Sequence, residues 1–250
     1  MSAPAVPAVP AAPPARTLLV SEMFGPTVQG EGPSAGRRCG FLRLGGCNLH
    51  CSWCDTPYTW DWQGQSDTGI AYDAGAELTV VDVETVVASV LAMRVDLLVV
   101  TGGEPLRQQR RLLPVVDRLA REGVGIEVET NGTIEPHEDL VRRGVRFNVS
   151  PKLAHASDPL ARRIRPGALR ALNHTPDVAF KFVCRDPADL EEVAGLVAEF
   201  GLRPVWIMPE GRSPEVLQQR LTWLADAVVE RGWNLSTRLH VIAWGDKRGA

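Results

Sequence analysis

The chain has 250 residues, and its 27 basic and 30 acidic residues leave a net charge of −3, so we expect no broad basic surface for nucleic acid. Hydrophobic residues make up 44% and charged residues 23%, which is typical of a soluble globular protein with one sizeable core. No uninterrupted apolar run is long enough to cross a bilayer, so we expect a cytoplasmic protein without a membrane partner.

The first 16 residues differ in composition from the rest of the chain. They consist mainly of Ala, Pro and Val, and prolines interrupt every apolar run. A secretory signal needs a basic start and an unbroken apolar segment, and neither is present. We therefore predict a disordered Pro/Ala-rich tail at residues 1–16 and a single domain at residues 17–250.

Short apolar segments alternate with amphipathic segments from about Leu18 onward. The predicted strands are Arg38–Leu44, Leu97–Thr101, Gly125–Thr130, Arg146–Ser150, Ala179–Val183, Pro204–Met208 and His240–Trp244. The predicted helices are Asp82–Met93, Leu106–Arg121, Asp186–Phe200 and Ser213–Arg231. This alternation predicts an α/β fold with a mostly parallel sheet. The weakly patterned stretch Thr59–Thr79 is interpreted as a loop that packs over the cysteines before it.

Several predicted strands end in a polar or glycine-containing motif. These motifs are Thr101–Pro105, Glu129–Gly132, Ser150–Lys152 and Pro209–Gly211. The carboxyl ends of parallel strands form the active face of barrels and open α/β sheets. We therefore expect the four motifs on one rim, although plain turns are the alternative interpretation.

Three of the five cysteines lie within eight positions, at Cys47, Cys51 and Cys54. An odd total with this crowding is not a disulfide framework. Three thiolates can hold three irons of a 4Fe–4S cluster, and soft thiolates suit such clusters. The fourth iron would then be open to a ligand that chelates through an amine and a carboxylate.

Two other sites are compatible with these cysteines. A structural zinc ion needs four ligands, so Cys39 or His50 would have to complete the set. A thioredoxin-like redox pair would use Cys51 and Cys54 and leave the third cysteine unexplained. Cys39 and Cys184 lie in apolar segments and are predicted to be buried, inert thiols.

The cysteine spacing, followed by Gly102-Gly103-Glu104-Pro105 after the next strand, resembles the radical S-adenosylmethionine (SAM) superfamily. Three further motifs resemble the 7-carboxy-7-deazaguanine synthase family: Glu22–Gly32, Cys54–Trp60 and Leu239–Gly245. The resemblance extends from about Leu18 to Gly245. Each motif alone is only weakly specific for the family, but the whole set in this order is highly specific.

The resemblance implies a partial, incomplete TIM-like barrel of the radical SAM type and a homodimer. It implies a Mg2+-dependent radical ring contraction of 6-carboxy-5,6,7,8-tetrahydropterin to 7-carboxy-7-deazaguanine with loss of ammonia, in the queuosine or a related 7-deazapurine pathway. The cofactors would be a 4Fe–4S cluster, SAM and Mg2+. The electron donor would be a protein such as flavodoxin or ferredoxin.

The resemblance also implies roles for individual residues. The cluster ligands would be Cys47, Cys51 and Cys54, and Thr56 would bind Mg2+. The SAM contacts would be Gly102, Gly103, Glu104, Ser150, Pro151 and Lys152, with Glu129 and Asn131 assisting. The substrate contacts would be Val28, Gln29, Gly30, Glu31, Arg43, Thr101 and His240. Arg43 would bind the substrate carboxylate; the alternative interpretation is that Arg43 is an ordinary cation on the protein surface.

Two other functional classes remain open from the sequence. One is a radical SAM activase that makes a glycyl radical on a protein partner, which shares the cysteine spacing. The loop Gln29–Gly32 before the cysteines and the short carboxyl end favour a small substrate instead. The other class is a non-enzymatic zinc-binding module.

Overall fold

The structure is a computed structural model that describes residues 16–249. The predicted tail, apart from Arg16, lies outside the described residues. Within the described part of the chain, no helix combines the length and the apolar character needed to span a membrane.

One open, curved sheet of nine strands runs through the described part of the chain, in the order β3-β1-β2-β4-β5-β6-β7-β8-β9. The strands are β1 (Thr17–Val28), β2 (Arg38–Leu44), β3 (Thr79–Asp82), β4 (Leu97–Gly102), β5 (Gly125–Thr130), β6 (Arg146–Val149), β7 (Val178–Cys184), β8 (Val205–Pro209) and β9 (Asn234–Leu235). From β2 to β9 all neighbours are parallel, whereas β1 is antiparallel to both β2 and β3. Because β3 and β9 are opposite edges that do not pair, the barrel is incomplete, as predicted.

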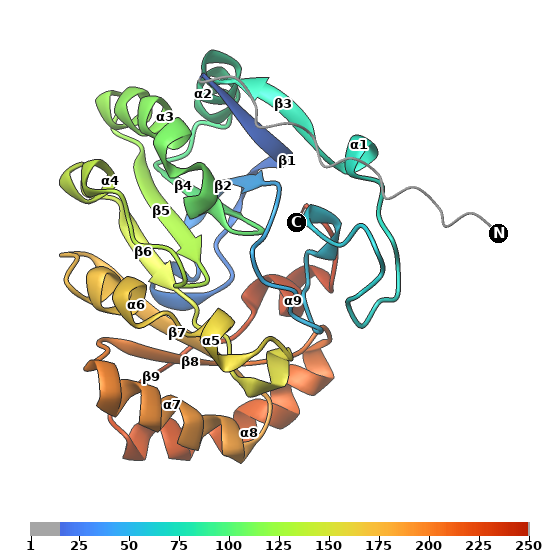
Figure 1. The fold of residues 1–250 in the computed structure, drawn as a ribbon, viewed down its shortest axis with the longest axis vertical. Coiled ribbons are helices and arrows are strands. Elements are labelled where there is room, and N and C mark those ends of the chain that lie inside the picture. The colour runs from blue at the N-terminus through green and yellow to red at the C-terminus, as the bar shows by residue number, and fades with distance from the viewer. Residues whose placement is uncertain (1–15, 250) are drawn as a thin grey trace.

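Helices cover the outer side of the sheet (Figure 1). The α-helices are α1 (Ala74–Glu77), α2 (Val83–Ala92), α3 (Gln109–Arg121), α4 (Glu138–Arg142), α5 (Leu160–Arg163), α6 (Pro166–Asn173), α7 (Pro187–Phe200), α8 (Pro214–Glu230) and α9 (Leu239–Trp244). Short 3-10 turns are η1 (Gly32–Ser34), η2 (Pro57–Thr59), η3 (Pro105–Gln108) and η4 (Ala154–Ala156). Helix α7 begins after Asp186, whose side chain accepts from the N–H groups of Ala188 and Asp189 in a capping box.

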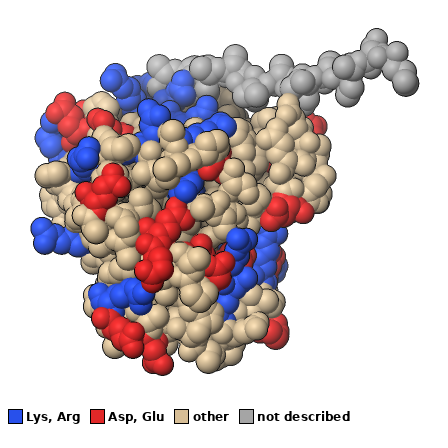
Figure 2. Space-filling model, turned by 60° about the horizontal axis from the view of Figure 1, so that its bottom comes forward, with Lys and Arg blue, Asp and Glu red and all other residues tan. Residues whose placement is uncertain are grey.

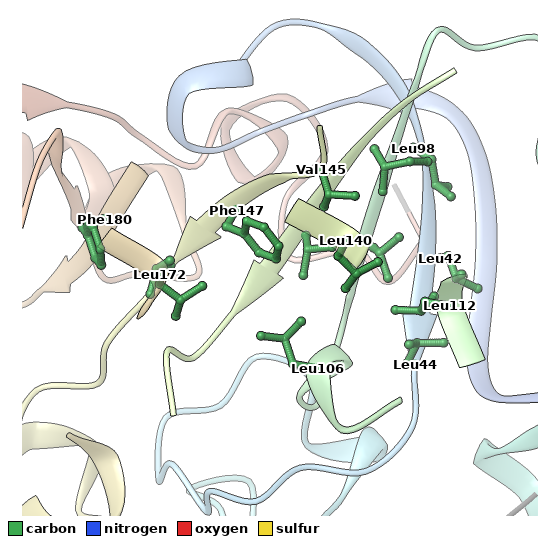
Figure 3. Close-up of a cluster of buried hydrophobic side chains, with 14 of the residues drawn as sticks. Leu42, Leu44, Leu98, Leu106, Leu112, Leu140, Val145, Phe147, Leu172 and Phe180 are labelled. Carbon is green, nitrogen blue, oxygen red and sulfur yellow. The ribbon is translucent and has the colours of Figure 1, made fainter. Parts of the chain in front are cut away.

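The main core lies between the sheet and these outer helices. Figure 3 shows Leu42, Leu98 and Phe147, from strands β2, β4 and β6, in one buried cluster with Leu112 and Leu140 from the helices. All five side chains are buried. Parallel strands that are buried on both faces have continuous apolar runs, as β4 does, which is why the strands could be predicted from the sequence.

The predicted strand at His240–Trp244 is wrong, because these residues form helix α9 (Leu239–Trp244). The N–H groups of Val241 and Ile242 both donate to the carbonyl of Arg238, which closes a local turn. Only Val241 is buried in α9, and Trp244 is 46% exposed. An apolar pentapeptide cannot be assigned by periodicity alone, and no sheet edge pairs with it here.

Strand β1 was not predicted, although it is the longest strand described, with 12 residues. Its burial does not alternate cleanly, and its pairing with β2 contains two register shifts. The other six predicted strands agree with the structure to within one residue at each end. The stretch Thr59–Thr79 does pack over the cysteines, since the N–H of Asp67 donates to the carbonyl of Ser52.

Charge on the face of the molecule in Figure 2 is mixed, with acidic and basic side chains interspersed. That pattern agrees with the small net charge and offers no broad basic surface on this face.

Candidate active site

A cavity of about 470 Å3 opens at the carboxyl ends of the parallel strands. The ends of β2, β4, β5, β6, β7 and β8 all contribute residues to its wall. Every predicted site residue lines it except Glu104 and Pro151, which are buried outside the lining. The strand-end motifs therefore lie on one rim, as their positions predicted.

The cysteine loop, residues 45–56, leaves the end of β2, and its three cysteines line the cavity. Its backbone is fixed by neighbouring segments: the N–H of Gly46 donates to Thr59 at 2.7 Å, and the N–H of Ser52 donates to the carbonyl of Ala156 at 3.1 Å. The carboxylate of Asp158 accepts from the N–H of His50 at 2.9 Å. Protein contacts thus hold the loop in place on both sides of Cys51.

The three thiols of the cysteine loop share an apolar setting with Leu49, Trp53 and Ala156. Burial raises the pKa of Cys47 to about 12 and raises the pKa values of Cys51 and Cys54 as well. Thiolates in such a setting need positive charge nearby, which metal ligation supplies. The indole N–H of Trp60, 3.3 Å from the Cys54 sulfur, gives one hydrogen bond. The donor set and its setting therefore fit an iron–sulfur cluster.

The two candidates for a fourth zinc ligand lie elsewhere. Cys39 packs in a separate apolar cluster with Phe41 and Val99, and Cys184 is buried in the main core, so both are buried thiols as predicted. His50 is outside the cavity lining and meets Trp60 edge-on at 5.1 Å. Among residues 16–249, no three His, Cys, Asp or Glu side chains converge on a single-ion site.

Gly102 and Gly103 bring the backbone of β4 against the cysteine loop. The N–H of Gly103 donates to Leu44 at 3.0 Å, and a Cβ at Gly103 would lie 2.3 Å from the carbonyl oxygen of Gly46. Gly102 has φ +139°, and a Cβ there would lie 2.1 Å from the Leu44 oxygen. Only glycine fits both positions without moving the loop.

Glu104 is buried behind the residues that line the cavity. Its buried carboxylate accepts from the Thr130 hydroxyl at 2.8 Å and from the N–H of Asn131 at 2.7 Å. Burial raises the pKa of Glu104, and these hydrogen bonds oppose that rise. The amide of Asn131 in turn donates to Asn48 at 3.0 Å. Glu104 thereby connects the end of β5 to the cysteine loop.

Ser150 and Lys152 lie at the end of β6 and face the cavity. The Lys152 ammonium donates to the Ser150 hydroxyl at 3.0 Å and lies 5.4 Å from the Trp53 ring centroid. This cation is part of the electrostatic surroundings of Cys51, where it opposes the rise of the thiol pKa that burial causes.

The charged end of the cavity consists of Glu31, Asp55, Lys181 and Arg238. The guanidinium of Arg238 donates to Glu31 at 3.0 Å, to Asp55 and to the carbonyl of Gly211 at 2.9 Å. Lys181 donates to Glu31 and lies 3.6 Å from Glu129. Chain segments far apart in sequence are thus joined by buried ion pairs.

The charges of this end stabilise one another. Burial alone would raise the pKa of Glu31, but Lys181 and Arg238 outweigh it and lower that pKa far below its usual range. Burial would lower the pKa of Lys181, whereas Glu129 and Glu31 raise it. Burial is also the main reason why the pKa of His240 is lowered, with Arg238 adding to the effect.

Sequence reasoning missed Lys181 and Arg238. A signal existed for Lys181, because a lysine inside the apolar run of β7 must be paired when it is buried. Arg238 gave no signal, since it stands in an ordinary polar stretch before α9.

Arg43 is not a surface cation, because its side chain is only 15% exposed and lines the cavity. Its Nε donates to Glu22 at 2.5 Å, and Glu22 also accepts from the Tyr58 hydroxyl at 2.8 Å. Arg248 donates to the same carboxylate at 3.2 Å and stacks on Tyr58. Glu22 therefore orients Arg43 and also binds the chain's carboxyl-terminal segment.

Beneath Glu31, a buried network supports the loop that follows β1. Glu127 accepts from Gln29 at 3.1 Å, from Asn148 at 2.6 Å and from Ser34 at 2.6 Å. Burial raises the pKa of Glu127, and the hydrogen bond from Ser34 opposes this effect most strongly. The network fixes Gln29, one of the predicted substrate contacts, against the floor of the cavity.

Comparison with known proteins agrees with this geometry. The family model of the radical SAM superfamily matches residues 42–181, which include the cysteine loop and the glycine pair. The 7-carboxy-7-deazaguanine synthase of Pyrobaculum aerophilum is 38% identical over 92% of this chain and 96% of that protein.

The chain belongs to the 7-carboxy-7-deazaguanine synthase family of radical SAM enzymes. The enzyme of the same name from Halobacterium salinarum is 35% identical to this synthase homologue, over 92% of this chain and 91% of that protein. The crystal structure of QueE from Escherichia coli matches the fold with a TM-score of 0.67 and 26% identity, over 90% of this chain and 95% of that chain. The open barrel is therefore shared with a solved member.

Membership of this family decides between the functional classes that the sequence analysis left open. A radical SAM enzyme uses a 4Fe–4S cluster and SAM, so the zinc-binding module does not apply to this synthase homologue. The comparison with synthases over nearly the whole chain likewise favours a small substrate over a protein partner such as a glycyl-radical enzyme.

Proposed function

We propose that this enzyme converts 6-carboxy-5,6,7,8-tetrahydropterin to 7-carboxy-7-deazaguanine with loss of ammonia, in the 7-deazapurine or queuosine pathway. The observation that carries this proposal is a single cavity lined both by the three cysteines of the loop and by the charged end of Glu31, Asp55, Lys181 and Arg238, with Asp55 directly following Cys54. The relatives that cover nearly all of the chain bear the name of this synthase.

Cys47, Cys51 and Cys54 would hold the cluster, which together with SAM would supply reductive carbon–sulfur cleavage when bound. Gly102 and Gly103 let the cysteine loop pack against the end of β4 and also line the cavity, where the methionyl end of SAM would lie. Ser150, Lys152 and Asn131 line the same cavity, where polar groups of SAM need partners. Glu104 and Pro151 would act by shaping the cavity wall.

The substrate would lie in the same cavity, beside the cysteine loop and the charged end. Arg43 would bind the substrate carboxylate with the guanidinium nitrogens that Glu22 does not use. Gln29, Glu31 and Glu129 supply acceptors for the N–H groups of the pterin edge, and Val28, Gly30, Thr101 and His240 complete the wall. A buried N–H without an acceptor is costly, so these oxygens would select the ring.

Mg2+ would bind at Thr56, next to Asp55 and on the cavity wall. Mg2+ prefers oxygen ligands and keeps several waters, so one hydroxyl with substrate oxygens is a sufficient protein site. We further propose a homodimer, a cytoplasmic location and an electron donor of the flavodoxin or ferredoxin type, as the family resemblance implies.

Anaerobic turnover tests the reaction. The protein is reconstituted with iron and sulfide and mixed with dithionite, SAM, Mg2+ and the carboxytetrahydropterin, and products are followed by mass spectrometry. We expect 7-carboxy-7-deazaguanine without stoichiometric 5′-deoxyadenosine. Cleavage of SAM with no deazapurine would overturn the substrate assignment and leave the radical chemistry intact.

Titration with Mg2+ tests the metal site separately. For Thr56→Ala we expect the Mg2+ concentration at half-maximal rate to rise at least tenfold. The control Thr222→Ala, on the exposed surface of α8, should keep the wild-type curve. An unchanged curve for Thr56→Ala would remove Thr56 from the metal site.

A further inference from the structure

The outer side of the cysteine loop, away from the cavity, is covered by two exposed arginines. Arg107, from η3, donates to the carbonyl of Cys47 at 3.0 Å. Arg162, from α5, donates to the carbonyl of Asn48 at 3.0 Å. Two cations therefore lie on consecutive peptide groups of the loop that holds the predicted cluster ligands.

Two more exposed arginines extend this basic surface, Arg110 and Arg165, each three residues beyond one of the first pair. Among the described residues, Arg107, Arg110 and Arg165 form no ion pair, and Arg162 reaches only the buried Asp158, at 3.8 Å. Most of the other arginines in the described residues form ion pairs with carboxylates, as Arg118 does with Glu84. The four arginines thus present uncompensated positive charge beside the cysteine loop.

A surface hollow of about 550 Å3 adjoins the same region. Its wall includes Thr133, whose hydroxyl accepts from the amide of Asn48 at 2.7 Å, and Leu160, which is 61% exposed. Arg165 lines the hollow together with Glu135 and Glu199, whereas Arg107, Arg110 and Arg162 lie outside its lining. Arginine is enriched at protein–protein interfaces, and Leu160 adds apolar area beside this basic edge.

We propose that Arg107, Arg110, Arg162, Arg165 and Leu160 form the docking surface for an acidic one-electron carrier protein. One electron would leave the reduced carrier and enter the cluster, and no bond would form or break. Because SAM and substrate would occupy the cavity side, the outer side is the short route to the thiol ligands. The chain's net charge of −3 repels an acidic partner overall, so a local basic surface is needed to steer it.

The test follows reduction of the cluster rather than turnover. Reconstituted enzyme is mixed anaerobically with a reduced, acidic flavodoxin in a stopped-flow instrument, and bleaching of the cluster absorbance is recorded. For the double variant Arg110→Glu/Arg165→Glu, whose side chains do not contact the loop, we expect the second-order rate constant at low salt to fall at least tenfold. The difference should shrink as salt is raised, because exposed charges are screened.

Two controls make the result decisive. Arg203→Glu changes an exposed arginine before β8, at the amino ends of the strands, and should keep the wild-type rate constant. Dithionite should reduce all variants equally, with the same electron paramagnetic resonance spectrum. An unchanged rate constant with flavodoxin for the double variant would overturn the docking surface.

The docking surface rests on the proposed cluster ligands, and the same samples separate the two failures. If the wild-type protein takes up no iron that dithionite can reduce, the proposed cluster is wrong. If dithionite reduces the cluster and flavodoxin reduces the double variant as fast as the wild-type protein, only the docking surface is wrong.

Discussion

The two ends of the cavity are built in different ways. The cysteine loop takes all three thiols from eight consecutive positions, and the backbone of Gly102 and Gly103 packs against it. The charged end takes Glu31, Asp55, Lys181 and Arg238 from four distant parts of the chain. One end is therefore a local motif, and the other exists only in the folded chain.

Because of this difference, we expect substitutions in the cysteine loop to affect function more than stability, and substitutions in the charged end to affect stability. The cysteine loop is fixed by backbone hydrogen bonds to its neighbours, so loss of one thiol leaves its position largely unchanged. The charged end consists of ion pairs that connect the loop after β1, the cysteine loop, β7 and the segment before α9. Lys181 and Arg238 are buried, so removing either of them leaves Glu31 with a single cationic partner.

The largest expected effect is at the cysteine end, for Cys54→Ser. We expect turnover to fall to background and iron content to drop, because only two thiols of the motif remain. The free energy of unfolding of the metal-free protein should change by no more than about 1 kcal/mol, since serine can still accept from Trp60. The control Cys39→Ala, in a separate apolar cluster, should keep its iron. Full iron content in Cys54→Ser would contradict the ligand assignment.

Arg238→Gln should break the charged end. The change removes one of the two cations that pair with Glu31 and the partner of Asp55, which is 39% exposed, at a cost of about 1–3 kcal/mol in the free energy of unfolding. Thermal unfolding should then shift down by roughly 2–12 °C for a chain of this size. The matched control is Arg231→Gln, whose partner Glu191 is 73% exposed, and it should cost under about 1 kcal/mol. Equal shifts for the two variants would show that burial adds nothing at Arg238.

Gly103→Ala tests the contact between β4 and the cysteine loop. The new Cβ would meet Gly46 at 2.3 Å, so the loop must move, and we expect a cost of about 1–3 kcal/mol with lower iron content. Gly195→Ala, in α7 with open space around it, should instead stabilise the protein by about 0.5–1 kcal/mol. Wild-type iron content in Gly103→Ala would show that the loop tolerates displacement.

The smallest expected effect lies behind the cysteine end, at Asp189. Burial would raise the pKa of Asp189, but hydrogen bonds from His155 and the N–H of Arg185 outweigh it, so its pKa is lowered. A lowered folded-state pKa gives stability above the unfolded value, near 3.9, that is lost as pH falls through the folded value. Asp189→Asn should therefore cost about 1–2 kcal/mol at pH 7 and progressively less below pH 4. Urea unfolding across this range measures it, and a constant difference would exclude the linkage.

Much of the fold followed from the sequence because its signals are local. Buried parallel strands require continuous apolar runs, and Asp186-Pro187 begins a helix by its own side-chain hydrogen bonds. Strand β1 and helix α9 could not be assigned in this way. The pairing of β1 is irregular, and α9 depends on how Arg238 is anchored in the cavity.

The cysteine loop, the glycine pair and the strand-end motifs could be found from the amino-acid sequence, because chemistry that needs fixed spacing or the absence of a Cβ is encoded in consecutive residues. The folded structure was needed to show that Glu22 orients Arg43 and that Lys181 and Arg238 neutralise Glu31. Glu31 is separated in the sequence from Lys181 by 150 positions and from Arg238 by 207 positions. No local pattern encodes which distant residues will form such buried ion pairs.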